Sequence, residues 1–398
     1  MRIFISTGEV SGDLQGGLLV EALSRKANYL GVDLEIVALG GDRMEAAGAK
    51  ILGKTTRLGS MGIVEGLPFV LPTLKIQSRA KQFLRENPPD LLILLDYLAP
   101  NISIGSFVAK TLPDVPIVYY IAPQAWIWSA TEQKRLGKMV DRLFSTKKLI
   151  EISDHLLAIF QEEAHYYSSR GLPVTWVGHP LLDRMKSAPT REEARHKFGL
   201  SADTKVIALF PASRQQELKY LVPLVCQVGR QIQNQLGDVH FLVPVPLTAY
   251  RTKIESLIEE YGLKATVLEG ARTLEAMAAA DLAIAKSGTV NLEIALLDVP
   301  QVVVYRLSAL SAWIARRIMR FSIPFVSPVN LVLKREIVPE LLQESANPDF
   351  IVQESLDVLL NTQRRIKMRA GYREMRENLG EAGVCDRVAE AIFSKFLS

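Results

Sequence analysis

Acidic and hydroxyl side chains follow the first apolar segment of the chain at close spacing. Residues Phe4 to Asp13 read FISTGEVSGD, which predicts a short buried strand over Arg2 to Thr7 and a helix that starts near Asp13. A turn between a strand and a helix exposes backbone N–H groups, to which anions or sugar hydroxyls can bind. The alternative is an ordinary turn in which Ser11 or Asp13 caps the helix, and this stretch taken alone favours that alternative. The candidate site residues of the turn are Gly8, Glu9, Ser11, Gly12 and Asp13.

A second strand-turn-helix pattern lies at Ala283 to Arg306, AIAKSGTVNLEIALLDVPQVVVYR. Ser287, Gly288 and Thr289 form the turn, where small residues let a diphosphate approach the backbone and the two hydroxyls add donors. Glu293 follows about one helical turn later and can accept hydrogen bonds from the two hydroxyls of a ribose. In the alternative, the helix is simply capped and Glu293 balances its dipole.

A third turn, ALFPASRQQEL from Ala208 to Leu218, supplies a cation. Arg214 directly follows the first predicted strand of the second half, so its guanidinium should lie at the carboxyl edge of a sheet and hold a phosphate bidentately. Ser213 can cap the helix that follows. An isolated arginine is usually a solvated surface residue, but two turns suited to anions in one domain favour nucleotide binding.

Several common motifs are missing from the sequence. There is no GxxxxGK[ST] phosphate loop and no GxGxxG fingerprint, which argues against ATPase and NAD-dependent activities. There is also no DxD, no HxxxH pair and no CxxC pair, so we predict no metal site and no cofactor. Without a metal, the negative charge of a leaving diphosphate must be stabilised by Arg214 and by the turn at Ser287.

Composition narrows the class of protein. The chain has 398 residues, of which 48% are hydrophobic and 23% charged, and this excludes disorder and allows two domains. The net charge of +4 gives no bulk electrostatic reason for nucleic-acid binding, and no nucleic-acid partner is predicted. The two cysteines, Cys226 and Cys385, suit a reducing compartment. With no signal-peptide pattern and no apolar run of about 18 residues, we expect a cytoplasmic protein that at most attaches to a membrane surface.

Short apolar strands alternate with helical patterns along the chain, which predicts parallel sheets covered by helices. Two such series of similar length indicate two doubly wound α/β domains that bind ligand at the carboxyl ends of their strands. We place the domains at residues 1–185 and 186–345, with C-terminal helices at 346–398 packing across the seam. The predicted strands are Arg2–Thr7, Glu35–Leu39, Leu91–Asp96, Ile117–Ile121, Arg142–Thr146, Val174–Val177, Lys205–Phe210, His240–Val243, Thr266–Leu268, Leu282–Ala285 and Val302–Tyr305.

Eight motifs in a fixed order resemble those of the lipid-A-disaccharide synthases, glycosyltransferases of the GT-B fold, in which two Rossmann-like domains face a central cleft. They are GEVSGD, GGDRMEAAGA, MGIVEGL, YYIAPQAWIWS, VGHPLLD, FPASRQQEL, SGTVNLE and VSPVNLVLKREIVPELLQ, and they cover about Ile3 to Gln343. The resemblance implies inverting transfer of 2,3-diacylglucosamine from UDP to the 6'-hydroxyl of 2,3-diacylglucosamine 1-phosphate. It also implies that Gly8, Glu9, Ser11, Gly12 and Asp13 line the catalytic cleft. The residues that would hold UDP are Arg214, Ser287, Gly288, Thr289 and Glu293, with Asn330 reaching the cleft from the same domain.

Asp96 is the predicted catalytic base or its immediate electrostatic partner, with Glu9 and Asp13 as rivals. Asp96 ends the run LLILLD, and an inverting transfer needs one base that takes the proton of the attacking hydroxyl. The family pattern D-x-P-D-F-N is altered here to Asp96-Tyr97-Leu98-Ala99-Pro100-Asn101, without its second aspartate, and Ser129 follows Trp128 where the family often has arginine. Other UDP-N-acetylglucosamine-dependent GT-B transferases, a UDP-sugar epimerase and a non-catalytic UDP-sugar binding protein remain as alternatives.

Two segments combine apolar and basic side chains, and diacylated substrates must be drawn from a bilayer. Residues 65–83, EGLPFVLPTLKIQSRAKQF, place Leu67, Phe69, Val70 and Leu71 near Lys75, Arg79 and Lys81; residues 311–321, SAWIARRIMRF, are similar. Each segment taken alone is explained equally well if its apolar side chains pack in the core and its basic side chains are solvated. Together with lipid substrates they favour peripheral binding to an anionic membrane, at the inner face of the plasma membrane.

Overall fold

The computed structural model of the chain describes residues 1–56, 67–123, 146–307 and 325–397, and these fall into two compact units. Unit 1 comprises residues 1–56, 67–123, 146–183 and 378–397, and unit 2 comprises residues 184–307 and 325–377. The chain therefore enters unit 2 between Asp183 and Arg184 and returns to unit 1 between Glu377 and Asn378. The predicted tail, residues 346–398, is divided between the two units and forms no separate body within the described ranges.

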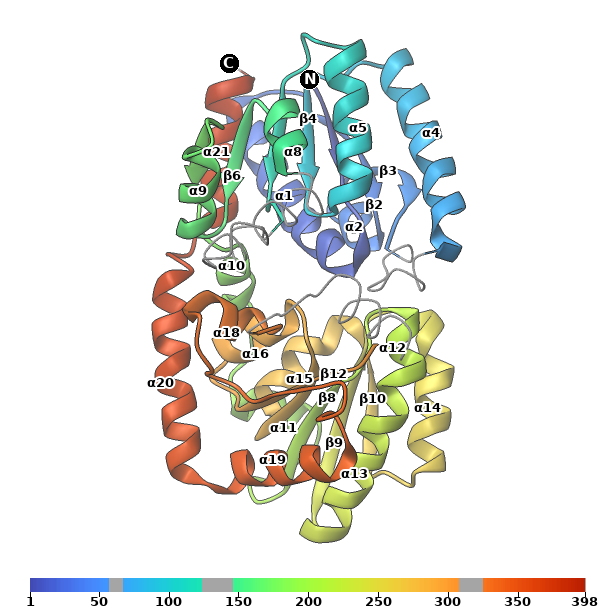
Figure 1. The fold of residues 1–398 in the computed structure, drawn as a ribbon, viewed down its shortest axis with the longest axis vertical. Coiled ribbons are helices and arrows are strands. Elements are labelled where there is room, and N and C mark those ends of the chain that lie inside the picture. The colour runs from blue at the N-terminus through green and yellow to red at the C-terminus, as the bar shows by residue number, and fades with distance from the viewer. Residues whose placement is uncertain (57–66, 124–145, 308–324, 398) are drawn as a thin grey trace. The chain divides into compact units, whose positions relative to one another are not determined.

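Unit 1 is a parallel sheet with helices on its faces (Figure 1). Its strands, as far as the structure describes them, have the order β3-β2-β1-β4-β5-β6-β7. Their bounds are β1 Arg2–Ser6, β2 Glu35–Gly40, β3 Lys50–Lys54, β4 Leu91–Leu95, β5 Ile117–Tyr120, β6 His155–Ala158 and β7 Val174–Trp176. The side chains of the central strands, from Ile3 to Ile5 and from Leu91 to Leu95, are fully buried, as expected for a parallel sheet covered on both faces.

The helices of unit 1 include one that comes from the far end of the chain. They are α1 Glu9–Leu30, α2 Asp42–Ala46, α4 Val70–Glu86, α5 Leu98–Thr111, α8 Thr146–Ile152, α9 Gln161–Ser168 and α21 Val384–Phe396, with a 3-10 turn η1 at Leu67–Phe69; α10 Leu181–Met185 spans the crossing. The C-terminal α21, red in Figure 1, packs beside α1, where Arg25 pairs with Asp386 at 2.9 Å. The carboxylate of Asp183 accepts hydrogen bonds from the N–H groups of Gly383 and Cys385 and so fixes the start of α21.

Unit 2 repeats the same architecture. Its described strands, all parallel, have the order β10-β9-β8-β11-β12-β13. Their bounds are β8 Lys205–Phe210, β9 Val239–Val245, β10 Ala265–Glu269, β11 Leu282–Lys286, β12 Gln301–Tyr305 and β13 Glu340–Leu342. The helices are α11 Arg191–Lys197, α12 Gln215–Tyr220, α13 Val222–Leu236, α14 Arg251–Glu260, α15 Thr273–Ala279, α16 Val290–Leu296, α18 Pro328–Leu333, α19 Pro348–Leu360 and α20 Thr362–Asn378, with 3-10 turns η2 Thr248–Tyr250 and η3 Gly270–Arg272.

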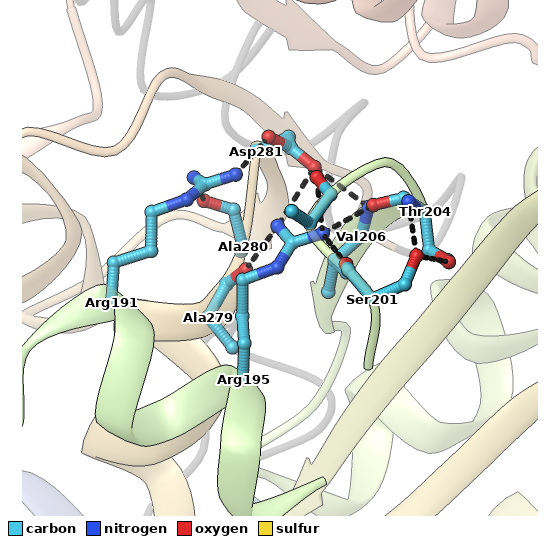
Figure 2. Close-up of polar contacts among 9 residues, drawn as sticks. Arg191, Arg195, Ser201, Thr204, Val206, Ala279, Ala280 and Asp281 are labelled. Atoms are coloured by element: carbon cyan, nitrogen blue, oxygen red, sulfur yellow. Dashed lines mark hydrogen bonds and ion pairs between the residues drawn. The ribbon is translucent and has the colours of Figure 1, made fainter. Parts of the chain in front are cut away.

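A buried arginine network ties α11 to the sheet of unit 2 (Figure 2). Arg195, 6% exposed, donates to the carbonyls of Ala279 and Ser201, at 3.3 and 2.8 Å, and to that of Thr204. Asp281 accepts from the N–H of Val206 at 2.9 Å and pairs with both Arg191 and Arg195. Asp281 and both terminal nitrogens of Arg195 have partners within the fold, although Nε of Arg195 has no hydrogen-bond partner, so the network stabilises the fold.

Most of the predicted strands are present, and the differences have local causes. Residues 142–145 of the predicted strand Arg142–Thr146 lie outside the described residues, and Thr146 is the first residue of α8. The sequence analysis missed β3, which is partly exposed and contains a glycine, and the four-residue β6 and three-residue β13, which are too short for a periodic signal. Helix α1 begins at Glu9, with Gly8 as its N-cap and no side-chain cap, so the prediction of a start near Asp13 was wrong.

Candidate active site

Both sheets reverse their strand order once, and the two reversals locate the candidate site residues. In unit 1 the reversal lies between β1 and β4, which pair in parallel with Ser6 opposite Leu94. In unit 2 it lies between β8 and β11, with Phe210 opposite Ala285. Such a reversal is called a switch point. Open parallel sheets bind ligands at their switch points, beyond the carboxyl ends of the strands. Glu9 and Asp96 follow β1 and β4, whereas Arg214 and Ser287 follow β8 and β11.

Backbone strain is concentrated at this edge of unit 1. Glu9, Asp96, Tyr97 and Ile121 all have positive φ, at 61°, 49°, 39° and 60°, and they follow β1, β4 and β5. A residue with a side chain pays of the order of 1–3 kcal/mol for such a conformation, and strain of this kind clusters at functional sites. The strained turns are therefore a structural reason to place the chemistry of unit 1 here.

Hydrogen bonds from Asn101 stabilise the turn at Asp96. The side chain of Asn101 is fully buried and donates to the carbonyls of Leu95 and Asp96 at 3.1 and 2.7 Å, while its own oxygen accepts from the hydroxyl of Ser6 at 2.8 Å. The hydroxyl of Tyr119 also donates to the carbonyl of Asp96, at 2.8 Å. Asn101 is the last residue of the altered acidic motif, so the motif still supplies the residue that fixes Asp96.

Gly8, Glu9 and Tyr97 lie together across the switch point of unit 1. A Cβ atom at Gly8 would lie 2.4 Å from the ring of Tyr97, so only glycine fits beneath that ring. Burial raises the pKa of Tyr97, the nearby charge of Glu9 raises it further, and a hydrogen bond with Thr73 opposes both. The structure thus brings the predicted residues Gly8, Glu9 and Asp96 to one place, with Ser11 half-buried on the first turn of α1.

Asp13 has a different environment. Its side chain is buried and accepts hydrogen bonds from the N–H groups of Arg43 at 3.1 Å and Met44 at 3.2 Å, in the first turn of α2. Burial raises its pKa, and the backbone donors of α2 counteract that rise. Gly12 is also a packing position, because a Cβ atom there would lie 2.2 Å from the hydroxyl oxygen of Thr7. These contacts make Asp13 an anchor for α2 and fit a catalytic base less well than those of Asp96 or Glu9.

Glu163 is a residue of this edge that the sequence analysis did not single out. It is fully buried and accepts from the N–H groups of Ala122 at 2.8 Å, Ile159 at 2.7 Å and Phe160 at 3.3 Å. Burial raises its pKa to about 8 in spite of these donors, with a further contribution from the charge of Asp96. Glu163 therefore fixes the strained Ile121-Ala122 turn, the start of the YYIAPQAWIWS motif. Residues 124–145, with both tryptophans of that motif, lie outside the described residues.

In unit 2, Glu217 shapes the turn that carries Arg214. Its side chain is inaccessible to solvent, and one oxygen accepts from the N–H groups of Ser213 and Arg214 at 2.6 and 3.0 Å. The other lies 3.5 Å from the guanidinium of Arg214, whose side chain is 16% exposed. Arg214, and not Ser213, is the N-cap of α12, so the predicted capping by Ser213 was wrong. The hydroxyl of Ser213 instead donates to Glu217, at 3.2 Å.

The Ser287-Gly288-Thr289 turn also has internal supports. The hydroxyl of Ser287 donates to the carbonyl of Val326 at 2.6 Å, and the N–H of Gly288 donates to the side chain of Asn291 at 2.8 Å. Gly288 has φ 153°, and a Cβ atom there would lie 2.7 Å from the Nζ atom of Lys286. The ammonium of Lys286 thus lies against the turn, beside the switch point. The sequence analysis did not name Lys286 as a site residue, and its only sequence signal is its place at the end of β11, one residue before the turn.

Glu293 is already engaged by an arginine. Its Oε1 atom lies 3.0 Å from Nε of Arg184, and the two side chains are 6% and 10% exposed. Arg184 is the first residue of unit 2 that the structure describes, and it lies more than a hundred positions earlier in the chain. The predicted ribose acceptor is therefore half of a buried ion pair, which local sequence could not reveal.

Asn330 makes four hydrogen bonds within unit 2. Its Nδ2 donates to the carbonyl of Val338 at 2.9 Å and to Glu340 at 2.7 Å, and its Oδ1 accepts from the N–H groups of Ile337 and Val338 at 2.7 and 3.0 Å. The residue is fully buried. Glu340 in turn accepts from the N–H of Val326 at 2.8 Å, next to the carbonyl that holds Ser287. These bonds use the donors and the acceptor of the Asn330 side chain within the fold, and its predicted contact with substrate stays a prediction.

Within the described ranges, no three His, Cys, Asp or Glu side chains form a group that could hold a metal ion. Over the same residues, no helix is long and apolar enough to cross a membrane.

Comparison with known proteins identifies the family. The model of the lipid-A-disaccharide synthetase family matches residues 3–393. A curated relative from Gloeothece citriformis, named lipid-A-disaccharide synthase, is 60% identical over 98% of this chain and 99% of its own. Among solved structures, the UDP-GlcNAc 2-epimerase of Neisseria meningitidis has a TM-score of 0.66 at 11% identity, covering 99% of this chain and 100% of that chain. The glycotransferase of kitacinnamycin has a TM-score of 0.60 at 12% identity and covers 99% of each chain. The predicted α/β class with two Rossmann-like domains of the GT-B type is confirmed.

Proposed function

The chain belongs to the lipid-A-disaccharide synthase family and is thus a glycosyltransferase of lipid A biosynthesis, and we propose that it uses the two switch points for one transfer reaction. The donor is UDP-2,3-diacylglucosamine and the acceptor is 2,3-diacylglucosamine 1-phosphate. The products are the lipid A disaccharide 1-phosphate and UDP. The observation that carries the proposal is that the Arg214 turn and the Ser287-Gly288-Thr289 turn follow the neighbouring parallel strands β8 and β11.

UDP binds at the switch point of unit 2 in this proposal. Arg214 lies in the turn after β8 and Lys286 is the last residue of β11, the two strands that flank the reversal, and both are cations suited to a diphosphate. Gly288 lets the phosphates approach the backbone, and the hydroxyl of Thr289 adds a hydrogen-bond donor. Ser287 fixes the turn through its hydrogen bond to the carbonyl of Val326. Glu293 accepts hydrogen bonds from the ribose. Two cations at the leaving group remove the chemical need for a metal ion, so we propose metal-independent transfer.

Asp96 is the proposed general base. Its carboxylate takes the proton from the 6'-hydroxyl of the acceptor as that oxygen bonds to the anomeric carbon, and the bond from that carbon to the β-phosphate oxygen breaks with inversion. The strained backbone of Asp96, fixed by Asn101 and Tyr119, holds its carboxylate in one orientation without reorganisation in the transition state. Glu9, the first residue of the helix that follows β1 at the same switch point, is the rival base.

A surface on α4 of unit 1 supports peripheral membrane binding. Val70, Leu71 and Leu74 are 49%, 77% and 54% exposed, which is unusual for neighbouring large apolar side chains, and Lys75 and Arg79 are exposed beside them. Lys81, by contrast, is turned to the hydroxyl of Ser103 at 2.8 Å. We propose that this surface binds anionic lipid at the inner face of the plasma membrane. The second predicted segment, residues 311–321, lies outside the described residues.

An activity assay on the full chain tests this function directly. Incubation with UDP-2,3-diacylglucosamine and the acceptor, followed by mass spectrometry, should give the disaccharide 1-phosphate and one UDP per product. Activity should survive EDTA. A product that forms only after magnesium is restored would overturn metal independence, and epimerisation of the UDP-sugar without acceptor would overturn the transferase assignment.

A further inference from the structure

We propose that Arg184 is a positioning residue that orients the carboxylate of Glu293 toward the ribose and thereby sets the preference of this site for a ribonucleotide. The inference rests on the proposed binding of UDP at the switch point of unit 2. Arg184 belongs to none of the predicted nucleotide-binding turns. It directly follows the VGHPLLD motif.

The pair stands out among the ion pairs of unit 2 by its burial. Most of the others that the described residues form have an arginine or lysine side chain at least 34% exposed, as in Arg191 with Asp281, where the arginine is 46% exposed. In the Arg184–Glu293 pair both side chains are at most 10% exposed, and the two atoms are 3.0 Å apart. Arg184 and Glu293 are more than a hundred residues apart in sequence, so the tertiary fold brings them together.

A second buried arginine, Arg195, shows how a structural and a ligand-directed arginine differ. Arg195 donates to several backbone carbonyls besides its carboxylate, so its guanidinium completes the fold (Figure 2). In the part of the chain that the structure describes, the guanidinium of Arg184 makes one ion pair, with Glu293, and no hydrogen bond to a backbone carbonyl. A buried pair of this kind contributes little net folding stability, because removing both charges from water costs about as much as their attraction returns. Fixing the orientation of a carboxylate explains the pair better.

The chemistry of the pair suits a vicinal diol. A ribose presents two hydroxyl donors, and an ionised carboxylate accepts hydrogen bonds at both oxygens. Nε of Arg184 lies 3.0 Å from Oε1 of Glu293 as an ion pair without the geometry of a hydrogen bond, and neither oxygen of Glu293 accepts a hydrogen bond among the described residues. The attraction to the guanidinium of Arg184 restricts the rotation of the carboxylate, so its oxygens are oriented before the nucleotide arrives.

The test compares UDP with 2'-deoxy-UDP by titration calorimetry on the full chain. Arg184→Met removes the charge at similar length, and Arg184→Lys returns it. We expect the wild type to bind UDP more tightly than 2'-deoxy-UDP, and Arg184→Met to weaken UDP about tenfold to a hundredfold, as for a lost hydrogen bond to a charged group, with a smaller effect on 2'-deoxy-UDP. The preference for the ribonucleotide should therefore collapse, and Arg184→Lys should restore part of it.

Arg191→Met is the matched control, because it breaks an ion pair of the same unit that lies away from the switch point, and it should leave both affinities unchanged. Glu293→Gln should reproduce the loss of preference, which keeps the inference testable if Arg184→Met folds poorly. Equal weakening of both nucleotides, or no change in either, would overturn the role of Arg184 while leaving UDP binding intact. Failure of the wild type to bind UDP at all would instead overturn the proposed site, and the inference with it.

Discussion

Replacing Asn330 by alanine distinguishes a positioning residue from a substrate ligand. The amide makes four buried hydrogen bonds, so Asn330→Ala leaves the N–H groups of Ile337 and Val338 and the carbonyl of Val338 without their partner, besides the contact to Glu340. Each buried polar group left unpaired costs about 1–3 kcal/mol. With partial relaxation and water entry, we expect a loss of about 3–5 kcal/mol in the free energy of unfolding, which is large for one substitution.

Urea unfolding and UDP calorimetry on the same samples measure this prediction. Asn361→Ala is the control: Asn361 is exposed and accepts from the N–H groups of Gln363 and Arg364 at 3.1 and 3.2 Å, so its loss should cost only about 1 kcal/mol. Affinity for UDP should fall in Asn330→Ala because the loop that holds Ser287 loosens. If turnover is abolished while the stability stays within about 1 kcal/mol of wild type, Asn330 touches the substrate as the sequence predicts, and the positional reasoning fails.

The other predictions concern the charge of the site, the base, the membrane and pH. Arg214→Ala should weaken UDP binding about tenfold to a hundredfold by calorimetry, since one charge-assisted contact is lost. Asp96→Asn keeps shape but removes basicity, so turnover should fall roughly 10²- to 10⁴-fold with UDP affinity unchanged. Leu71→Asp with Leu74→Asp should abolish sedimentation with anionic vesicles. Because burial raises the folded pKa of Glu163 from 4.5 to about 8, its ionisation costs stability as pH rises through that window, by at most about 1.4 kcal/mol per pH unit.

Matched controls make each of these outcomes decisive. Arg230→Ala changes an exposed arginine and should leave UDP affinity unchanged. Unaltered turnover in Asp96→Asn would pass the role of base to Glu9. Tyr29, 83% exposed on α1, is the apolar control for the vesicle assay, and equal losses for Tyr29→Asp and the α4 variant would refute a specific surface. For Glu163, wild-type stability should fall relative to Glu163→Gln between pH 5 and 8, and a constant difference over that range would contradict the raised pKa.

The sequence alone determined the elements and their local turns. Apolar runs such as LLILLD specify buried parallel strands, and the residues that follow them, Asp96, Arg214 and Ser287 among them, must lie at the carboxyl edge, because a parallel strand ends there whatever its neighbours are. That is why the two-domain class and the positions of both switch-point turns could be predicted. The fixed order of the eight motifs indicated the family.

Tertiary structure decided which side chains face one another, and therefore which of the candidates are occupied by the fold itself. Asp13 anchors α2, Asn330 closes a loop, and Glu293 pairs with Arg184, although none of these partners is a near neighbour along the helix or strand concerned. Glu163 showed no signal in the sequence, because a buried carboxylate that accepts three backbone hydrogen bonds has no periodicity to mark it. Local pattern fixes which residues end a strand, but only the packing of distant segments determines burial, hydrogen-bond partners and pKa, and these decide whether a polar side chain serves the fold or the ligand.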